Sequence, residues 1–267
     1  MRKVKFRVVA DTDIGKTKQK NQDSLLVKHA CHPDGTGEVL LAVLCDGMGG
    51  LSRGEQASAS VIRAFENWFE KDFRKLVERD SLPPEMILEQ WKALLEYENQ
   101  KMRNSSSRAQ PMGTTCTAVL LIENTIAMIH VGDTRLYRFG ENGEDGTQLT
   151  TDHTFVAGEI AAGRMTPSEA AVDRRRNLLI QCVGASVRIR PQMFVQPLSP
   201  GSYLLCSDGF RHEVSIEEMS RAVGPKLALK KMKTAVRQLI ETNMTRGEKD
   251  NISAILIQVE CIDKRCL

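Results

Sequence analysis

Apolar positions recur at two spacings along the chain, and each spacing predicts one kind of secondary structure. Residues 3–11 alternate polar and apolar side chains, which is typical of a strand with one buried face. Residues 39–45 are a continuous apolar run and predict a strand that is buried on both faces. Further strands are expected at 21–28, 114–122, 125–131, 135–139, 202–207 and 252–259.

Three other stretches have apolar residues at helical spacing. Residues 54–73 contain an apolar stripe made of Ala57, Val61, Phe65, Trp68 and Phe69. Residues 83–102 begin with Pro84, which suits the first turn of a helix, and their buried face is expected to hold Ile87, Trp91, Leu94 and Leu95. Residues 227–243 are expected to turn inward Leu229, Met232, Val236 and Leu239.

The order of these elements indicates the fold class. The strands between residues 114 and 139 are separated by the tight turns Glu123-Asn124 and Gly132-Asp133, so we expect antiparallel hairpins. Helices and hairpins come in separate blocks, which favours an α+β layered fold over a βαβ fold. No repeat, low-complexity segment or linker interrupts the chain, so residues 1–267 are expected to form a single domain.

Composition excludes some classes of partner. The chain has 267 residues, of which 41% are hydrophobic and 27% are charged, as in ordinary soluble globular proteins. The formal net charge of +3 gives no field that points to nucleic acid, and the basic run at 174–176 is interpreted as a solvated loop. We therefore expect no nucleic-acid partner.

The cysteines and the N-terminus bear on the compartment. None of the 7 cysteines falls in a CxxC pair and their number is odd, so neither a zinc site nor a complete disulfide framework is suggested. No apolar run is long enough to span a bilayer, and residues 1–6 lack the apolar core of a signal peptide. We expect a cytoplasmic protein with no membrane partner.

Four aspartates lie at the ends of predicted apolar strands: Asp46, Asp133, Asp208 and Asp250. A carboxylate at the edge of a hydrophobic core is costly unless a positive charge meets it. For any single one of them, turn formation is a sufficient explanation, because Asp and Gly are common in turns. Four in one chain, together with Asp23 after Asn21-Gln22, favour convergence on a cation.

The type of ligand then selects the metal. These are hard oxygen donors without a nearby His or Cys pattern, so Mg²⁺ or Mn²⁺ suits them better than Zn²⁺ or copper. Calcium is the rival, but the chain contains no spacing of the EF-hand kind. Carboxylates that share two cations can bind a bridging water, lower its pKa and hold the oxygens of an in-line phosphoryl displacement.

Read with their neighbours, these residues resemble the metal-dependent serine/threonine phosphatases of type 2C, particularly the bacterial branch. The matching motifs occur in family order and cover almost the whole chain. They are Asp13-Ile14-Gly15, Asn21-Gln22-Asp23, Val43-Leu44-Cys45-Asp46-Gly47-Met48-Gly49-Gly50, Gly113-Thr114-Thr115, Val131-Gly132-Asp133-Thr134-Arg135, Leu149-Thr150-Thr151-Asp152-His153, Cys206-Ser207-Asp208-Gly209 and Asp250-Asn251-Ile252.

The resemblance implies a fold and an activity. The fold would be a four-layer α-β-β-α sandwich, with two antiparallel β-sheets flanked by helices and a metal cleft at one end. The activity would be hydrolysis of phosphoserine and phosphothreonine on proteins by a water or hydroxide that bridges two Mg²⁺ or Mn²⁺ ions. Residues from about 155 to 184 match the variable flap beside the active site.

The resemblance also implies roles for individual residues. Asp46 would bridge two metals, the Gly47 carbonyl would bind one of them, and the catalytic pair would be Asp46 and Asp208, acting through metal-bound water. Asp208 and Asp250 would complete the ligands of the first metal, and Asp23 would act at the second, possibly through water. Asp133 matches the position that holds a third metal together with Asp208. Two to three Mn²⁺ or Mg²⁺ ions are therefore expected.

Phosphate binding departs from the family pattern. The family usually has an arginine three residues before the asparagine of the Asn-x-Asp motif, and this chain has Lys18 there. Lysine keeps the charge but lacks the planar two-pronged donor of arginine. We expect Lys18 to bind the substrate phosphate. Lys16 and Lys20 could substitute, although solvated loop lysines are an equally good interpretation of those two.

The source of the leaving-group proton is also open. Eukaryotic relatives carry a histidine just after the Asp-Gly pair, and this chain has Met48 there, as bacterial members do. His153 could replace it, but a hydrogen-bonded loop histidine is the better interpretation of its motif. A metal-bound water is the other candidate.

Three alternative functions remain. The first is a catalytically weak relative that binds phosphoproteins or a kinase, and it ranks below catalysis because all the core aspartates are present. The others are a two-metal phosphohydrolase for small phosphate esters and a structural Ca²⁺-binding protein. For the favoured function, the expected partners are phosphoproteins, those of a Ser/Thr kinase in particular, and a monomer is expected.

Overall fold

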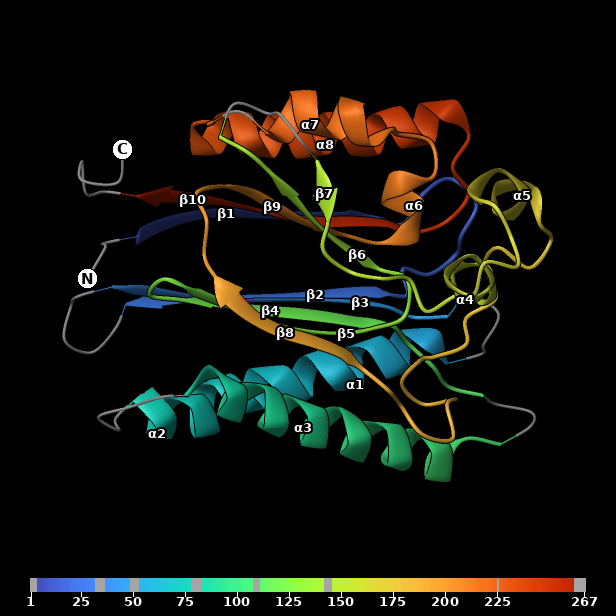
Figure 1. The fold of residues 1–267 in the computed structure, drawn as a ribbon, viewed down its shortest axis with the longest axis horizontal. Helices are drawn as coiled ribbons and strands as arrows, with labels where there is room; N and C mark the ends of the chain where they lie inside the picture. The colour runs from blue at the N-terminus through green and yellow to red at the C-terminus, as the bar shows by residue number, and fades with distance from the viewer. Residues whose placement is uncertain are drawn as a thin grey trace.

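Two antiparallel five-stranded sheets lie face to face in the computed structural model, which describes residues 4–31, 37–48, 53–77, 83–107, 111–141, 146–224 and 226–261 (Figure 1). The first sheet contains, in spatial order, β1 (Val4–Asp13), β10 (Ile252–Cys261), β9 (Gly201–Cys206), β6 (Arg135–Phe139) and β7 (Thr147–Gln148). The second contains β2 (Asp23–Cys31), β3 (Glu38–Asp46), β4 (Cys116–Ile122), β5 (Thr125–Val131) and β8 (Gln192–Pro197).

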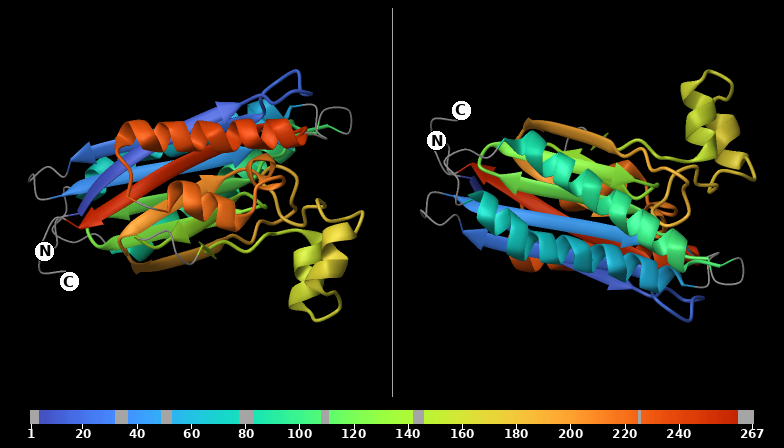
Figure 2. Two further views of the ribbon diagram at one scale, coloured as in Figure 1. Left: turned by 90° about the horizontal axis from the view of Figure 1, so that it is seen from above. Right: turned by 90° about the horizontal axis from the view of Figure 1, so that it is seen from below.

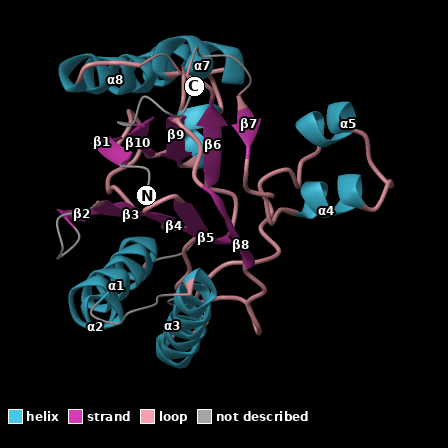
Figure 3. Cartoon of the chain, turned by 60° about the vertical axis from the view of Figure 1, so that its left-hand side comes forward, coloured by secondary structure: helices cyan, strands magenta, loops and turns pink. Residues whose placement is uncertain are grey.

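Helices cover the outer face of each sheet, which gives the expected α-β-β-α layers (Figures 1 and 3). The second sheet packs against α1 (Gly54–Asn67), η1 (Trp68–Phe73), α2 (Arg74–Val77) and α3 (Pro84–Ser105). The first sheet packs against α6 (Asp208–Arg211), α7 (Ile216–Val223) and α8 (Leu229–Arg246). A separate pair, α4 (Phe155–Ala161) and α5 (Pro167–Val172), projects from the side of the sandwich (Figure 2).

Strand β3 shows how the apolar pattern builds the layers. Leu40, Ala42 and Leu44 point between the two sheets, where they meet side chains of β1, β9 and β10. Leu41, Val43 and Cys45 point the other way, toward α1 and α3. Successive side chains of a strand alternate between its faces, so a strand with both faces covered must be apolar throughout. The prediction for residues 39–45 is confirmed.

Most predicted elements are confirmed, with differences that have local causes. The helix predicted at 54–73 continues past Asn67 as a π-helical segment, η1, in which Trp68 and Phe73 are buried. The prediction that Leu229 turns inward is wrong, because it is the first residue of α8 and is 54% exposed. Met232, Val236 and Leu239 are buried as expected.

Several elements were not predicted from the pattern, namely α6, α7, β7 and β8. Strand β8 lies at the edge of its sheet, and its residues are half-buried with no clear alternation. Among the described residues, no helix is long and apolar enough to cross a membrane.

The strand order brings the sequence motifs to one end of the sandwich. Strand β3 ends at Asp46 and β2 begins at Asp23, while β9 ends just before Asp208 and β10 begins just after Asp250. This end also carries α6, with α4 and α5 beyond it (Figure 1). Gly49 and Gly50 of the first Asp-Gly motif lie outside the described residues.

Candidate metal and phosphate site

Asp23 and Asp46 are brought together by the pairing of β2 with β3, in which they stand directly opposite each other. The backbone of Asp46 is held by the two residues just before β4: its N–H donates to Thr115 Oγ1 (2.9 Å), and its carbonyl accepts from Thr114 Oγ1 (2.9 Å) and Thr115 N (2.8 Å). The Gly-Thr-Thr motif therefore fixes the position of Asp46.

Asp208 and Asp250 come together where β9 ends and β10 begins. Ser207 N donates to the carbonyl of Ser253 (3.0 Å), and Ser253 N donates to Ser207 Oγ (3.0 Å). The two segments approach so closely that a Cβ on Gly209 would lie 2.3 Å from the carbonyl oxygen of Asn251. Glycine is thus required beside Asp208 for backbone contact.

Asn251 connects this pair to the loop that carries Lys18. Its side-chain oxygen accepts from Gln22 N (2.9 Å), and its amide donates to the carbonyls of Ile14 (2.9 Å) and Lys20 (3.1 Å). The side chain is buried, so all three bonds are shielded from water. Sequence reasoning placed Asn251 only within a motif and missed this connecting role.

The four carboxylates repel one another at this partly buried end of the sandwich. Burial, followed by the charges of Asp23 and Asp208, raises the pKa of Asp46 well above its ordinary value. Burial, followed by the charges of Asp208 and Asp250, raises the pKa of Asp23 to about 7. Like charges brought together away from water are stable only if a cation joins them or if they take up protons.

Unpartnered oxygens mark where a cation would fit. Both carboxylate oxygens of Asp23 and Oδ1 of Asp208 are buried without a hydrogen-bond partner in the described part of the chain. Gly47, next to Asp46, is packed so tightly that a Cβ on it would lie 2.4 Å from the carbonyl oxygen of Gly54. An oxygen-only donor set of this kind suits Mg²⁺ or Mn²⁺.

The carboxylates do not close around a cation by themselves. Within the described ranges, no three His, Cys, Asp or Glu side chains form a compact metal cage. Mg²⁺ usually keeps several waters and takes only one or two carboxylates. A donor set made of oxygens alone does not fit a structural zinc site, which uses Cys and His ligands.

Lys18 reaches the same cluster from the loop before β2. Its Nζ lies 2.6 Å from Asp250 Oδ1, and the two side chains are 29% and 38% exposed. Burial lowers the pKa of Lys18, but the hydrogen bond and charge of Asp250 outweigh it and raise the pKa overall. Lys20 instead pairs with Glu55 at 2.8 Å. Of these two lysines, only Lys18 is positioned beside the acidic cluster.

Asp133 lies beside the cluster and is paired with the guanidinium group of Arg211. It follows Gly132, whose φ of 118° is in the left-handed region, and Oδ2 of Asp133 lies 3.6 Å from Nη2 of Arg211. Burial and the charge of Asp208 raise the pKa of Asp133 to about 7, while Arg211 acts in the opposite direction. Sequence reasoning did not identify Arg211.

His153 holds the turn that carries Asp133. Its backbone N donates to the carbonyl of Gly132 (2.7 Å), and its Nδ1 accepts from the N–H of Gly132 (3.1 Å). Burial lowers the pKa of His153. The interpretation as a hydrogen-bonded loop histidine is confirmed.

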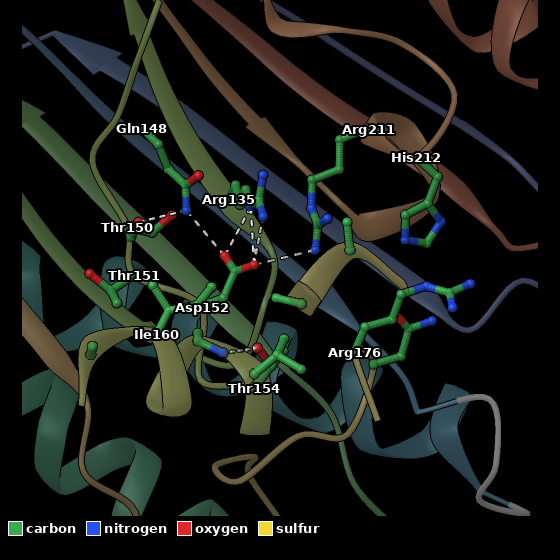
Figure 4. Close-up of a pocket in the computed structure, with 16 residues that line it drawn as sticks. Arg135, Gln148, Thr150, Thr151, Asp152, Thr154, Ile160, Arg176, Arg211 and His212 are labelled. Atoms are coloured by element: carbon green, nitrogen blue, oxygen red, sulfur yellow. Dashed lines mark hydrogen bonds and ion pairs between the residues drawn. The ribbon is translucent and has the colours of Figure 1, made fainter. Parts of the chain in front are cut away.

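Two adjoining cavities surround the acidic end. One, of about 610 Å³, lies between α4–α5 and the β6–β7 edge and is lined by Arg135, Asp152, Arg176, Arg211 and His212 among others (Figure 4). The other, of about 560 Å³, includes Lys18, Asp250, Arg176 and His212. Because Arg176 and His212 line both cavities, the segment after α5 borders the route to the acidic cluster.

Comparison with known proteins agrees with this geometry. The family model described as protein phosphatase 2C matches residues 14–256. A putative protein phosphatase 2C-type from Streptococcus pyogenes is 31% identical over 264 residues, which cover 97% of this chain and 99% of that protein. The protein phosphatase PhpP of Streptococcus pneumoniae is 32% identical over 252 residues, covering 93% and 95% of the two chains.

Solved structures are similar along nearly the whole chain. The serine/threonine phosphatase of S. agalactiae has a TM-score of 0.81 and 28% identity, covering 96% of this chain and 100% of that one. The catalytic domain of the serine/threonine protein phosphatase PstP in complex with two manganese ions has a TM-score of 0.73 and 28% identity, covering 96% and 99%.

Proposed function

Because the chain belongs to the protein phosphatase 2C family and is a serine/threonine protein phosphatase of that type, we propose that it hydrolyses phosphoserine and phosphothreonine esters on proteins at a centre of two divalent cations. The observation that supports this most is the set of unpartnered, buried oxygens on Asp23 and Asp208. They adjoin Asp46, whose pKa burial and neighbouring carboxylates raise. No lysine, arginine or histidine side chain in the described part of the chain is bonded to the oxygens of Asp23.

We assign the ligands by position. Asp46 and the carbonyl of Gly47 would hold the cations between them. Asp208 and Asp250 would complete the protein ligands of the first cation, and Asp23 would serve the second. When bound, Mn²⁺ or Mg²⁺ ions would lower the pKa of a coordinated water and hold the oxygens of the phosphoryl group. The protein's task is to hold these carboxylates in place, which the bonds to Thr114, Thr115 and Asn251 support.

Lys18 is proposed to capture the substrate phosphate. Its ammonium lies at the edge of the acidic cluster and is 29% exposed, so it can turn from Asp250 toward an incoming phosphoryl group. Asp250 then becomes available to a cation. Lysine contributes a point charge with rotatable donors, and orientation of the phosphate relies more on the cations than it would with arginine.

Residues 155–184 are proposed to act as a flap within one phosphatase domain that spans residues 1–267. The base of this segment is pinned where Ile180 N donates to the carbonyl of His153 (2.8 Å) and Phe155 N donates to the carbonyl of Leu178 (2.8 Å). Arg176, near that base, borders both cavities. Substrates are phosphoproteins made by a Ser/Thr kinase, and the chain acts as a monomer.

The direct test is phosphate release from a phosphothreonine peptide and from an aryl phosphate, with Mn²⁺, with Ca²⁺ and with EDTA. We expect release from the peptide with Mn²⁺ and none with EDTA. Activity that persists in EDTA would contradict the proposal. A chain that binds the phosphopeptide but releases no phosphate under any condition would instead be a binding module, and activity on the aryl phosphate alone would indicate a small-ester phosphohydrolase.

A further inference from the structure

Arg211 stands where the family resemblance would place a third cation. Helix α6 begins at Asp208 and ends at Arg211, so one turn of helix joins a proposed metal ligand to this guanidinium. The Arg211 side chain reaches toward Asp152 (Figure 4), and it also contacts Asp133.

Three contacts hold the guanidinium in this position. Nη2 donates to the backbone carbonyl of Asp133 (3.2 Å), lies 3.6 Å from the carboxylate of the same residue and lies 3.7 Å from the carboxylate of Asp152. The side chains of Arg211, Asp133 and Asp152 are only 14%, 10% and 12% exposed. The group is thus enclosed between two carboxylates.

Charge at this position is already balanced. Asp152 is bound in a two-pronged way by Arg135, with Nε 2.9 Å from Oδ1 and Nη2 2.7 Å from Oδ2. Two carboxylates, Asp133 and Asp152, therefore face two guanidinium groups, Arg135 and Arg211. The contrast is with Asp23, whose two buried oxygens have no hydrogen-bond partner among the described residues.

A divalent cation on Asp133 would have to share its carboxylate with Arg211. The guanidinium cannot lose its proton to relieve the repulsion between the two positive charges, unlike a lysine. Lys18 at Asp250 is in a different situation, because its flexible side chain is 29% exposed and can swing into solvent. Arg211 is less free to move into solvent, because its Nη2 also donates a hydrogen bond to the backbone carbonyl of Asp133.

We propose that the guanidinium of Arg211 takes the place of a third cation at Asp133, so that this chain binds two divalent cations and not three. The inference rests on the proposed two-cation centre and replaces the sequence-based expectation of a third metal ligated by Asp133. Arg211 is a positioning residue here: it holds Asp133 in place and supplies a permanent charge that does not depend on metal supply.

The test is the number of Mn²⁺ ions bound per chain at saturation, followed through the electron paramagnetic resonance signal of free Mn²⁺ during titration. The wild-type chain is expected to bind two ions, and Arg211→Met is expected to bind three. Arg221→Met, which removes an exposed arginine from α7, is the matched control and is expected to bind two.

Each outcome bears on a different claim. Three ions in the wild-type chain, or two in a folded Arg211→Met chain, would overturn the inference while leaving the proposed function intact. If Arg211→Met does not fold, Asp133→Asn decides the matter: two ions are expected, and a loss of one relative to wild type would overturn the inference. A wild-type chain that binds no Mn²⁺ would contradict the proposed function itself.

Discussion

Asp23 and Asp46 stand directly opposite each other on β2 and β3, at the end of the sandwich where β9 and β10 also deliver Asp208 and Asp250. Like charges directly opposite on neighbouring strands are destabilising. Burial increases the cost of placing these two negative charges together, and it raises the pKa of both carboxyl groups. The sheet therefore maintains an unfavourable pair at its edge, which a cation would convert into a stabilising contact.

The first prediction concerns Lys18. Lys18→Ala is expected to raise KM for a phosphothreonine peptide about tenfold, because one charge-assisted hydrogen bond of ~1.5 kcal/mol is lost. It is expected not to weaken Mn²⁺ binding, because Lys18 no longer pairs with Asp250. Steady-state kinetics with a Mn²⁺ titration measures both quantities. Lys20→Ala is the matched control, because Lys20 pairs with Glu55 and is 67% exposed. An unchanged KM in Lys18→Ala would remove Lys18 from the phosphate site.

The second prediction concerns Asn251. Asn251→Ala removes the bonds to Gln22, Ile14 and Lys20 and leaves those backbone groups to find new partners. We expect a loss of about 2–3 kcal/mol in the free energy of unfolding, measured by urea denaturation in EDTA. Asn67→Ala, an exposed residue at the end of α1, is expected to change the free energy of unfolding by less than about 0.5 kcal/mol. Equal effects of the two substitutions would contradict the role assigned to Asn251.

The third prediction concerns His130, which is fully buried on β5 and bonded through Nδ1 to Thr117 Oγ1 at 2.8 Å. Burial, assisted by His153 and opposed by Asp152, lowers the pKa of His130 from 6.5 to about 3. Because the pKa in the folded state lies below that in the unfolded state, the contribution of the neutral ring is complete above pH 6.5 and is lost as the pH falls toward about 3.

We therefore expect the free energy of unfolding to fall by up to about 4 kcal/mol over this acid range on account of His130. The measurement is urea denaturation at a series of pH values for wild type and His130→Gln. The variant should show a weaker acid dependence, whereas His29→Gln, which changes a more exposed histidine, should keep that of wild type. Parallel pH curves for wild type and His130→Gln would refute the assignment.

Periodicity predicted most strands of the two sheets but missed β7 and β8. The run at 39–45 is apolar throughout because both faces of β3 are covered, and the alternation in β1 reflects one buried face. Pattern alone did not find β8, because an edge strand with half-buried residues shows no clear period. The prediction that Leu229 is buried failed because this residue is at the terminus of a helix, where an apolar side chain can remain exposed to solvent.

The candidate site was predictable as a set of residues but not as an arrangement. Each aspartate was visible at a strand end, yet the pairing of Asp23 with Asp46 depends on the register of β2 against β3. The contact of Arg211 with Asp133 joins residues 78 positions apart, through a short helix that the pattern did not reveal. Such long-range contacts are set by tertiary packing and leave no local periodic signal.

The central claim, that Asp46 holds the cations that drive hydrolysis, is tested most directly by Asp46→Asn. Mn²⁺ binding and phosphate release should be measured on one preparation, with Asp72→Asn, an exposed aspartate, as the matched control. We expect that Asp46→Asn remains folded, loses bound Mn²⁺ and releases phosphate at least about a hundredfold more slowly, while Asp72→Asn matches wild type. Wild-type Mn²⁺ binding together with wild-type turnover in Asp46→Asn would contradict it.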